Sequence, residues 1–193
     1  MNAVLRNTIV SLSLLLPAAG FAGGSVSGKV DAQPAKYLEE TVVFIKDAKA
    51  PAAAKTEAMD QKGMKFVPHV VAVTEGDSVE FLNHDNVDHN VFSPDGETFN
   101  LGMIKFNGKG TYQFKKAGAY SQLCSVHPEM LGFVYVAPSP YHAVVDAKGN
   151  FKIANVPPGT YTLAVWNSHL KGAEQSITVT DGKATEVTLA VKR

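Results

Sequence analysis

The sequence contains one cysteine, carries no net charge and has no long apolar run beyond its first residues. A single cysteine cannot form a disulfide within the chain, so no disulfide framework supports the fold. The 18 basic and 18 acidic residues balance, which gives no basic surface for nucleic acid or for anchoring to a membrane. No later segment is long and apolar enough to form a transmembrane segment. These absences argue against nucleic-acid-binding and membrane-spanning proteins.

The first 22 residues have the pattern of a secretory signal peptide. Arg6 precedes an apolar segment at 8–16, and small residues end the region at Ala22, which predicts cleavage after that residue. We therefore expect a periplasmic or secreted protein. An unpaired thiol in an oxidising compartment needs a partner or a role, and binding to a metal provides one. The alternative is that the cysteine is only a small apolar residue in the core.

The cysteine begins a short segment with three candidate metal ligands, Cys124, His127 and Met130. Thiolate and thioether sulfur suit Cu(I), imidazole suits both copper oxidation states, and two histidines with one cysteine and a weak axial methionine form the blue-copper pattern. The second imidazole should come from a neighbouring strand. His89, which stands between apolar runs, has that setting.

Short segments of alternating polar and apolar residues, separated by turn residues, predict an all-β protein with little helix. A small-residue stretch at 48–58 reads as a linker, and Pro138-Ser139-Pro140 marks a second boundary. We expect strand-forming segments at 24–50, a copper-site domain at 56–137 and a further sandwich at 141–193. Trp166 is expected to fill the core of that last sandwich.

The middle region resembles the cupredoxins, the Greek-key β-sandwich copper proteins such as plastocyanin and amicyanin. The similarity lies in FVPHVVAVTEGDSVEFLNHDNVDHNVF and in the ligand loop CSVHPEM. It implies one type 1 copper site with His89, Cys124 and His127 as equatorial ligands and Met130 as the axial ligand. It also implies that Asn90 forms a hydrogen bond between the two ligand loops and so fixes the site.

The last region resembles the carboxypeptidase-regulatory, transthyretin-like β-sandwiches, chiefly in DAKGNFKIANVPPGTYTLAV. The first strands of that family are not directly before it but are similar to GSVSGKV and TVVFI, at 24–45. We therefore expect the cupredoxin domain to be inserted into the second sandwich, an arrangement that compact domains tolerate. In the simpler alternative, residues 24–45 are the first strands of the cupredoxin domain.

Other metal arrangements stay open on the sequence alone. Zinc is the main rival, although thioether is a poor zinc ligand, and Glu129 would make a harder site if it replaced Met130. A weak second metal site is possible among four further residues, His69, Met59, Met64 and His84. The acidic residues around the first-ligand loop are expected to form a solvated rim: Asp85, Asp88, Asp95 and Glu97.

The predicted function is a one-electron carrier between redox partner proteins, not an enzyme. Four ligands leave no open coordination position for a substrate, and the chain shows no nucleophile–base pattern. Apolar residues near His127, namely Val126, Leu131 and Phe92, are expected to form a small docking patch. The alternatives are a copper chaperone or storage protein, and a surface interaction module whose metal is structural.

Overall fold

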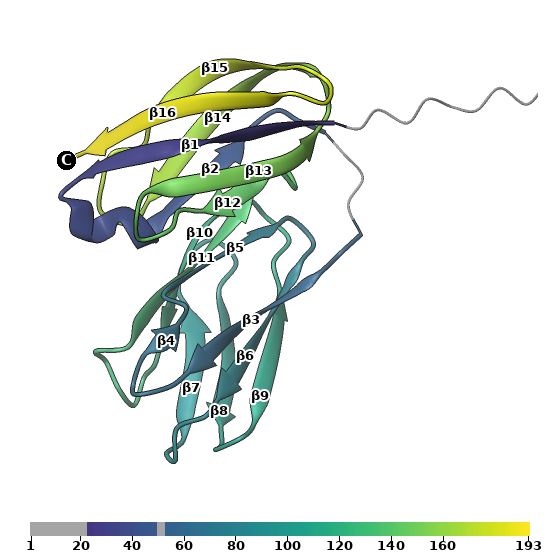
Figure 1. Cartoon of the computed structure of the whole chain (residues 1–193). Helices are drawn as coiled ribbons and strands as arrows, with labels where there is room; N and C mark the ends of the chain where they lie inside the picture. Colours follow the sequence, from purple (N-terminus) through teal and green to yellow (C-terminus); the bar gives the residue numbers. More distant parts are fainter. Residues whose placement is uncertain (1–22, 50–52) are drawn as a thin grey trace, which may run out of the picture.

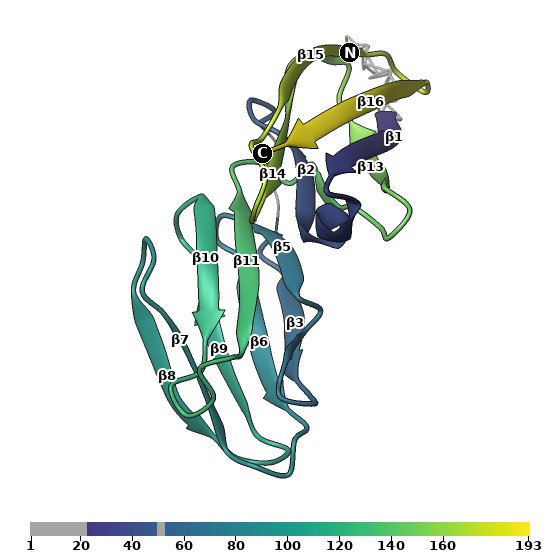
Figure 2. The same ribbon diagram turned by 90° about the vertical axis from the view of Figure 1, so that its left-hand side faces the viewer.

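The computed structural model describes residues 23–49 and 53–193, so the predicted signal peptide lies outside the described residues. The described chain forms two stacked β-sandwiches (Figures 1 and 2). We call the one built from residues 56–137 the first sandwich, and the one built from residues 24–45 and 142–192 the second sandwich. The predicted all-β fold with two sandwiches is confirmed. In the described part of the chain, the helical element is a single 3-10 helix, η1 (Ala35–Glu40).

The second sandwich combines strands from both ends of the chain. Its elements are β1 (Gly24–Gln33), β2 (Thr41–Ile45), β12 (His142–Val144), β13 (Asn150–Val156), β14 (Gly159–Asn167), β15 (Glu174–Val179) and β16 (Ala184–Lys192). Strand β1 lies between β13 and β16 in one sheet, and β2 lies between β12 and β14 in the other. Apolar side chains from both sheets, such as Val26, Ile45 and Leu163, fill its core. The first sandwich therefore lies, in sequence, between two groups of strands that share the same sheets.

The first sandwich is built from nine consecutive strands. They are β3 (Thr56–Gln61), β4 (Phe66–Val67), β5 (Val70–Thr74), β6 (Ser78–Asn83), β7 (His89–Ser93), β8 (Phe99–Ile104), β9 (Lys109–Gln113), β10 (Gly118–Leu123) and β11 (Leu131–Ala137). One sheet has the order β5-β11-β10-β7-β8 and the other β4-β3-β6-β9. Alternation in β6 buries Val79 and Phe81, because successive side chains of a strand point to opposite faces.

One local prediction differs from the structure, and one apolar run is divided. The expected linker at 48–58 ends earlier, because β3 begins at Thr56 and pairs in parallel with β6; residues 50–52 lie outside the described residues. The first half of β3 is exposed, so its sequence carries no apolar alternation by which a strand would be recognised. The apolar run at 66–73 is divided into β4 and β5 around Pro68, which has no N–H group for a sheet.

The two sandwiches meet through a hydrophobic interface. Val42 and Ala164 of the second sandwich pack with Val70 and Tyr135 of the first in one buried cluster. Trp166 is partly buried there and stacks on Tyr135, with ring centroids 5.0 Å apart and planes at 23°. The expectation that Trp166 fills the core of its own sandwich is therefore wrong. Its ring covers the end of the neighbouring sandwich instead.

Candidate metal centre

Two adjacent strands hold the predicted ligands. His89 is the first residue of β7, and Cys124 directly follows β10. These two strands are neighbours in one sheet and pair antiparallel at Phe92 and Leu123. The loop from Cys124 to Met130 then returns into β11, which also pairs with β10. Strand pairing therefore brings together residues that lie far apart in the sequence.

The structure brings His89, Cys124 and His127 into one cluster whose ligand atoms all lie within 4.8 Å of one another. The Nδ1 atoms of His89 and His127 are 2.9 Å apart, and the Sγ of Cys124 lies 3.8 Å and 3.9 Å from them. A point equidistant from these three atoms lies about 2 Å from each, near the ~2.0–2.3 Å bonds that imidazole and thiolate form with a first-row metal. The donor set therefore fits a metal ion.

The cluster is buried and its rings are held in defined orientations. His89 is 0% exposed and Cys124 2% exposed, whereas His127 is only partly buried. The two imidazole rings meet edge to face at 70°. The Nε2 atom of His89 lies 3.0 Å from Oδ2 of Asp85. A neutral His89 that donates this N–H has its free lone pair on Nδ1, which faces the other two ligands.

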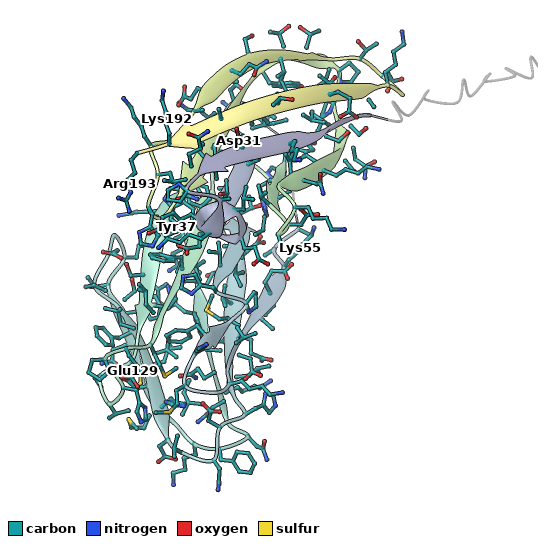
Figure 3. The ribbon with its side chains drawn as sticks, turned by 60° about the vertical axis from the view of Figure 1, so that its left-hand side comes forward. Asp31, Tyr37, Lys55, Glu129, Lys192 and Arg193 are labelled. Carbon is teal, nitrogen blue, oxygen red and sulfur yellow. The ribbon has the colours of Figure 1, made fainter. Side chains whose placement is uncertain are left out.

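Burial separates the two candidates for the axial position. Met130 is 1% exposed and packs in the same core cluster as Cys124. Its N–H donates to the carbonyl of His127 at 3.0 Å, which closes the ligand loop. Glu129 is exposed and lies at the surface of the first sandwich (Figure 3). A buried thioether next to the cluster favours Met130 over Glu129.

Asn90 links the two segments that carry the ligands. Its side-chain oxygen accepts hydrogen bonds from the backbone N–H of Ser125, at 2.6 Å, and from the Ser125 hydroxyl, at 2.8 Å. Asn90 is 3% exposed, so water competes little for these bonds. The amide therefore holds the start of the cysteine loop against β7.

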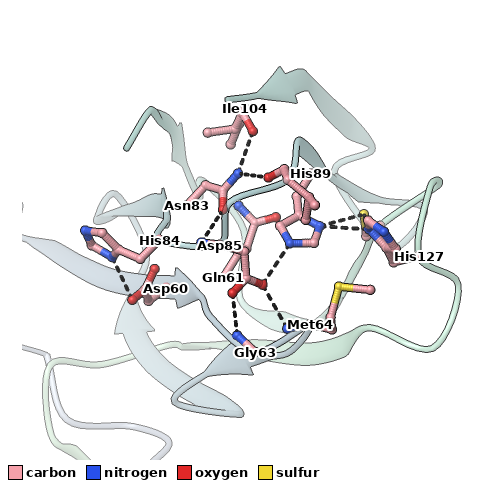
Figure 4. A network of polar contacts seen from close by, with 12 residues as sticks. Asp60, Gln61, Gly63, Met64, Asn83, His84, Asp85, His89, Ile104 and His127 are labelled. Carbon is pink, nitrogen blue, oxygen red and sulfur yellow. Dashed lines mark hydrogen bonds and ion pairs between the residues drawn. The ribbon is translucent and has the colours of Figure 1, made fainter. Parts of the chain in front are cut away.

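Asp85 is a functional candidate that the sequence reasoning missed, because it was assigned to a solvated rim. Its carboxylate contacts His89 and also accepts the backbone N–H groups of Gly63 and Met64, at 2.6 Å and 2.8 Å (Figure 4). Burial opposes its ionisation, but the N–H donors of Met64, Gly63 and His89 outweigh burial and lower the pKa of Asp85 below 3.8. The segment between β6 and β7 is not helical, so the spacing of Asp85 and His89 in the sequence gave no signal of this contact.

Two other acidic residues of the predicted rim accept hydrogen bonds from the backbone. Asp95 accepts the N–H of Ser121 in β10, and Glu97 accepts that of Lys115, so both carboxylates bind backbone groups.

The four candidates for a second site lie in different surroundings. Met59 is fully buried in the core and Met64 is 38% exposed, while His84 contacts Asp60 and His69 contacts Glu40. Within the described ranges, His69 and His84 belong to no cluster of three histidine, cysteine or carboxylate ligands.

The fold and the site define an all-β copper-site protein with a second sandwich. Residues 52–137 match the family model of copper binding proteins of the plastocyanin/azurin family, and this part of the chain is a cupredoxin domain. A second model, polysaccharide lyase family 4, domain II, matches residues 116–187. This second model describes a fibronectin-type β-sandwich, whereas the sequence resembles the transthyretin-like β-sandwiches. Its first matched strands, β10 and β11, belong to the cupredoxin domain.

Comparison with solved structures finds copper proteins of low overall similarity. Amicyanin from Paracoccus versutus (Thiobacillus versutus) is 26% identical, with 49% of this chain and 96% of that chain covered and a TM-score of 0.39. A copper-containing nitrite reductase from Thermus scotoductus SA-01 is 27% identical, with 47% and 24% covered and a TM-score of 0.40. A search of curated protein sequences found no match. Among the described residues, no helix has the length and apolar character needed to cross a membrane.

Proposed function

We propose that this chain is an exported type 1 copper protein that carries single electrons between redox partner proteins. The observation that supports it most is the buried triangle of two imidazole nitrogens and one cysteine sulfur, with Met130 buried beside it. This set of donors is the blue-copper pattern. Bound copper would supply a one-electron couple.

The residues around the site favour electron transfer over catalysis. His89 is held by Asp85, and the cysteine loop is held by Asn90, so the ligands have little freedom to move when the charge of the metal changes. The burial of His89 and Cys124 keeps water from the thiolate side. A bound metal would have four ligands, His89, Cys124, His127 and Met130. They would leave no usual position for a substrate, which supports a non-enzymatic role.

The surface beside the site is suited to brief contacts with a redox partner. Val126 and Leu131, on either side of the ligand loop, are 48% and 37% exposed. An open groove of ≈ 510 Å³ beside the loop combines apolar residues such as Met64, Val67 and Leu131 with polar ones, namely Glu40, Lys65, His69 and Glu129. Weak electron-transfer encounters use small interfaces. Because His127 is only partly buried, its ring edge would provide a route for electrons between a bound metal and a docked partner.

The experiment that tests this function is visible and EPR spectroscopy of the mature protein after addition of Cu(II). We expect the intense copper–thiolate band and narrow copper hyperfine splitting, and the loss of both in Cys124→Ser. Val126→Ala is the matched control, because this exposed residue of the same loop is not a ligand. Reversible one-electron voltammetry of the wild type should follow. A colourless protein, or ordinary tetragonal copper that survives Cys124→Ser, contradicts the proposal and favours copper delivery or a structural metal.

A further inference from the structure

The Asp85 carboxylate joins two loops next to the metal cluster. It belongs to the segment between β6 and β7, and it accepts both successive N–H groups of Gly63 and Met64 from the turn between β3 and β4. Asn83, which is fully buried, fixes the same segment by donating to the carbonyls of Val87 and Ile104, both at 2.8 Å (Figure 4). Asp85 is therefore fixed in place from two sides before any metal binds.

The contact between Asp85 and His89 decides which ring nitrogen carries the proton. A carboxylate accepts but does not donate hydrogen bonds, so the 3.0 Å contact requires the proton on Nε2 of His89. In the other tautomer, the Nδ1–H group would point toward Sγ of Cys124 and Nδ1 of His127, where a metal ligand needs a lone pair. Asp85 thus selects the tautomer that can bind a metal.

The same carboxylate places a negative charge on the far side of the ligand ring. The Asp85 side chain is only 15% exposed and that of His89 is 0% exposed, so water and salt screen this charge weakly. A carboxylate on the second ring nitrogen raises the basicity of a histidine ligand. A more basic ligand stabilises the more highly charged oxidation state of the metal.

We propose that Asp85 is a positioning residue that selects the Nδ1-ligating tautomer of His89 and lowers the reduction potential of copper held at this site. The inference rests on the proposed function, because the potential is that of the type 1 site. The prediction that Asp85 selects the tautomer of His89 concerns the metal-free protein and does not depend on copper binding.

Two variants separate the hydrogen bond from the charge. Asp85→Asn keeps an oxygen that accepts from His89 and Met64, but it removes the charge and the acceptor of the Gly63 N–H. Asp85→Ala removes all of these. Asp88→Asn is the matched control, since Asp88 lies in the same segment and its exposed side chain is screened by water. The tautomer of His89 is measured by long-range proton–nitrogen NMR of the reduced, metal-free protein, and the potential by spectroelectrochemistry of the copper form.

We expect wild type, Asp85→Asn and Asp88→Asn to show the Nε2–H tautomer of His89, and Asp85→Ala to show a mixture. In Asp85→Asn, the preference of the site for Cu(II) over Cu(I) should fall about tenfold, which is a rise of about 59 mV in the potential of a one-electron couple. Asp88→Asn should shift the potential much less.

Two results overturn the inference. One is a single Nε2–H tautomer in Asp85→Ala, and the other is an equal shift of potential in Asp85→Asn and Asp88→Asn. If Asp85→Ala does not fold, the comparison of Asp85→Asn with Asp88→Asn decides. Failure of the proposed function is a different outcome, since a wild type without a blue copper band still gives the tautomer result.

Discussion

At the scale of single residues, the hydrogen bonds of Asn90 tie together two segments separated by more than thirty positions in the sequence. Its oxygen accepts two hydrogen bonds from Ser125, and its amide group donates to Asn100 at 3.3 Å. Removing one partner of buried hydrogen bonds leaves the other donors unsatisfied, at a cost of about 1–3 kcal/mol. Asn90 is therefore a stabilising residue of the metal-free protein as well as a support for the site.

We predict that Asn90→Ala lowers the free energy of unfolding of the metal-free protein by about 1–3 kcal/mol. Ser125→Ala should cost less, because it removes the hydroxyl but keeps the backbone N–H that donates to Asn90. Urea unfolding of the two variants measures the difference. Equal stability of Asn90→Ala and Ser125→Ala would show that the backbone bond contributes nothing.

At the scale of elements, β1 decides how the second sandwich closes. It pairs antiparallel with β13 from Gly24 to Lys29. It pairs parallel with β16 from Ser25 to Gln33, which is nearly its whole length. At Gly28 the two backbones come so close that an added Cβ would lie 1.7 Å from the carbonyl oxygen of Val187. A backbone atom cannot rotate away as a flexible side chain does. A side chain at this position therefore forces β1 and β16 apart.

Gly28→Ala is expected to destabilise the second sandwich by about 3 kcal/mol, near the upper range for steric overpacking. The neighbouring substitution Ser27→Ala should stay within about 0.5 kcal/mol, because it removes only an exposed hydroxyl contact to Glu186. Denaturant unfolding followed by the fluorescence of Trp166, the only tryptophan, reports on both. A Gly28→Ala variant as stable as Ser27→Ala would contradict the close approach.

At the scale of the whole molecule, the two sandwiches are joined by a polar contact as well as by the apolar interface. His142 of β12 places Nε2 3.2 Å from the hydroxyl of Thr74 in β5. Burial lowers the pKa of His142 below its ordinary value of 6.5; the charge of Asp77 opposes this shift and that of Lys55 adds to it. The folded protein therefore favours the neutral ring. Stability is lost as the pH falls below about 6.5, because the unfolded chain then binds the proton more readily.

His142→Gln should make the melting temperature less dependent on pH between about pH 7.5 and pH 5, where unperturbed histidine titrates. His84→Gln is the control, because the side chain of His84 is 48% exposed and its pair with Asp60 lies at the surface, where ion pairs contribute little. Differential scanning calorimetry at both pH values measures the effect. Parallel losses of stability in wild type and His142→Gln would exclude a contribution from this contact.

Much of this architecture follows from local sequence. Alternation of polar and apolar residues predicted most strands, and the identity of Cys124, His127 and Met130 together with their short spacing predicted a copper-binding loop. Such features need only the chemistry of side chains and the period of a strand. Strand β3 was missed, because half of it is exposed and lacks that period.

Long-range contacts decided the features of the site and of the interface that local sequence did not predict. The sequence by itself determined which donors are available for a metal, since the types of ligand are fixed by the residues. Only the tertiary structure showed that Asp85 contacts His89 rather than solvent, and that Trp166 stacks on Tyr135 of the other sandwich. An acidic or aromatic residue has the same local pattern in either setting. Its energy depends on burial and on partners that the fold brings from distant positions, and sequence periodicity does not encode those partners.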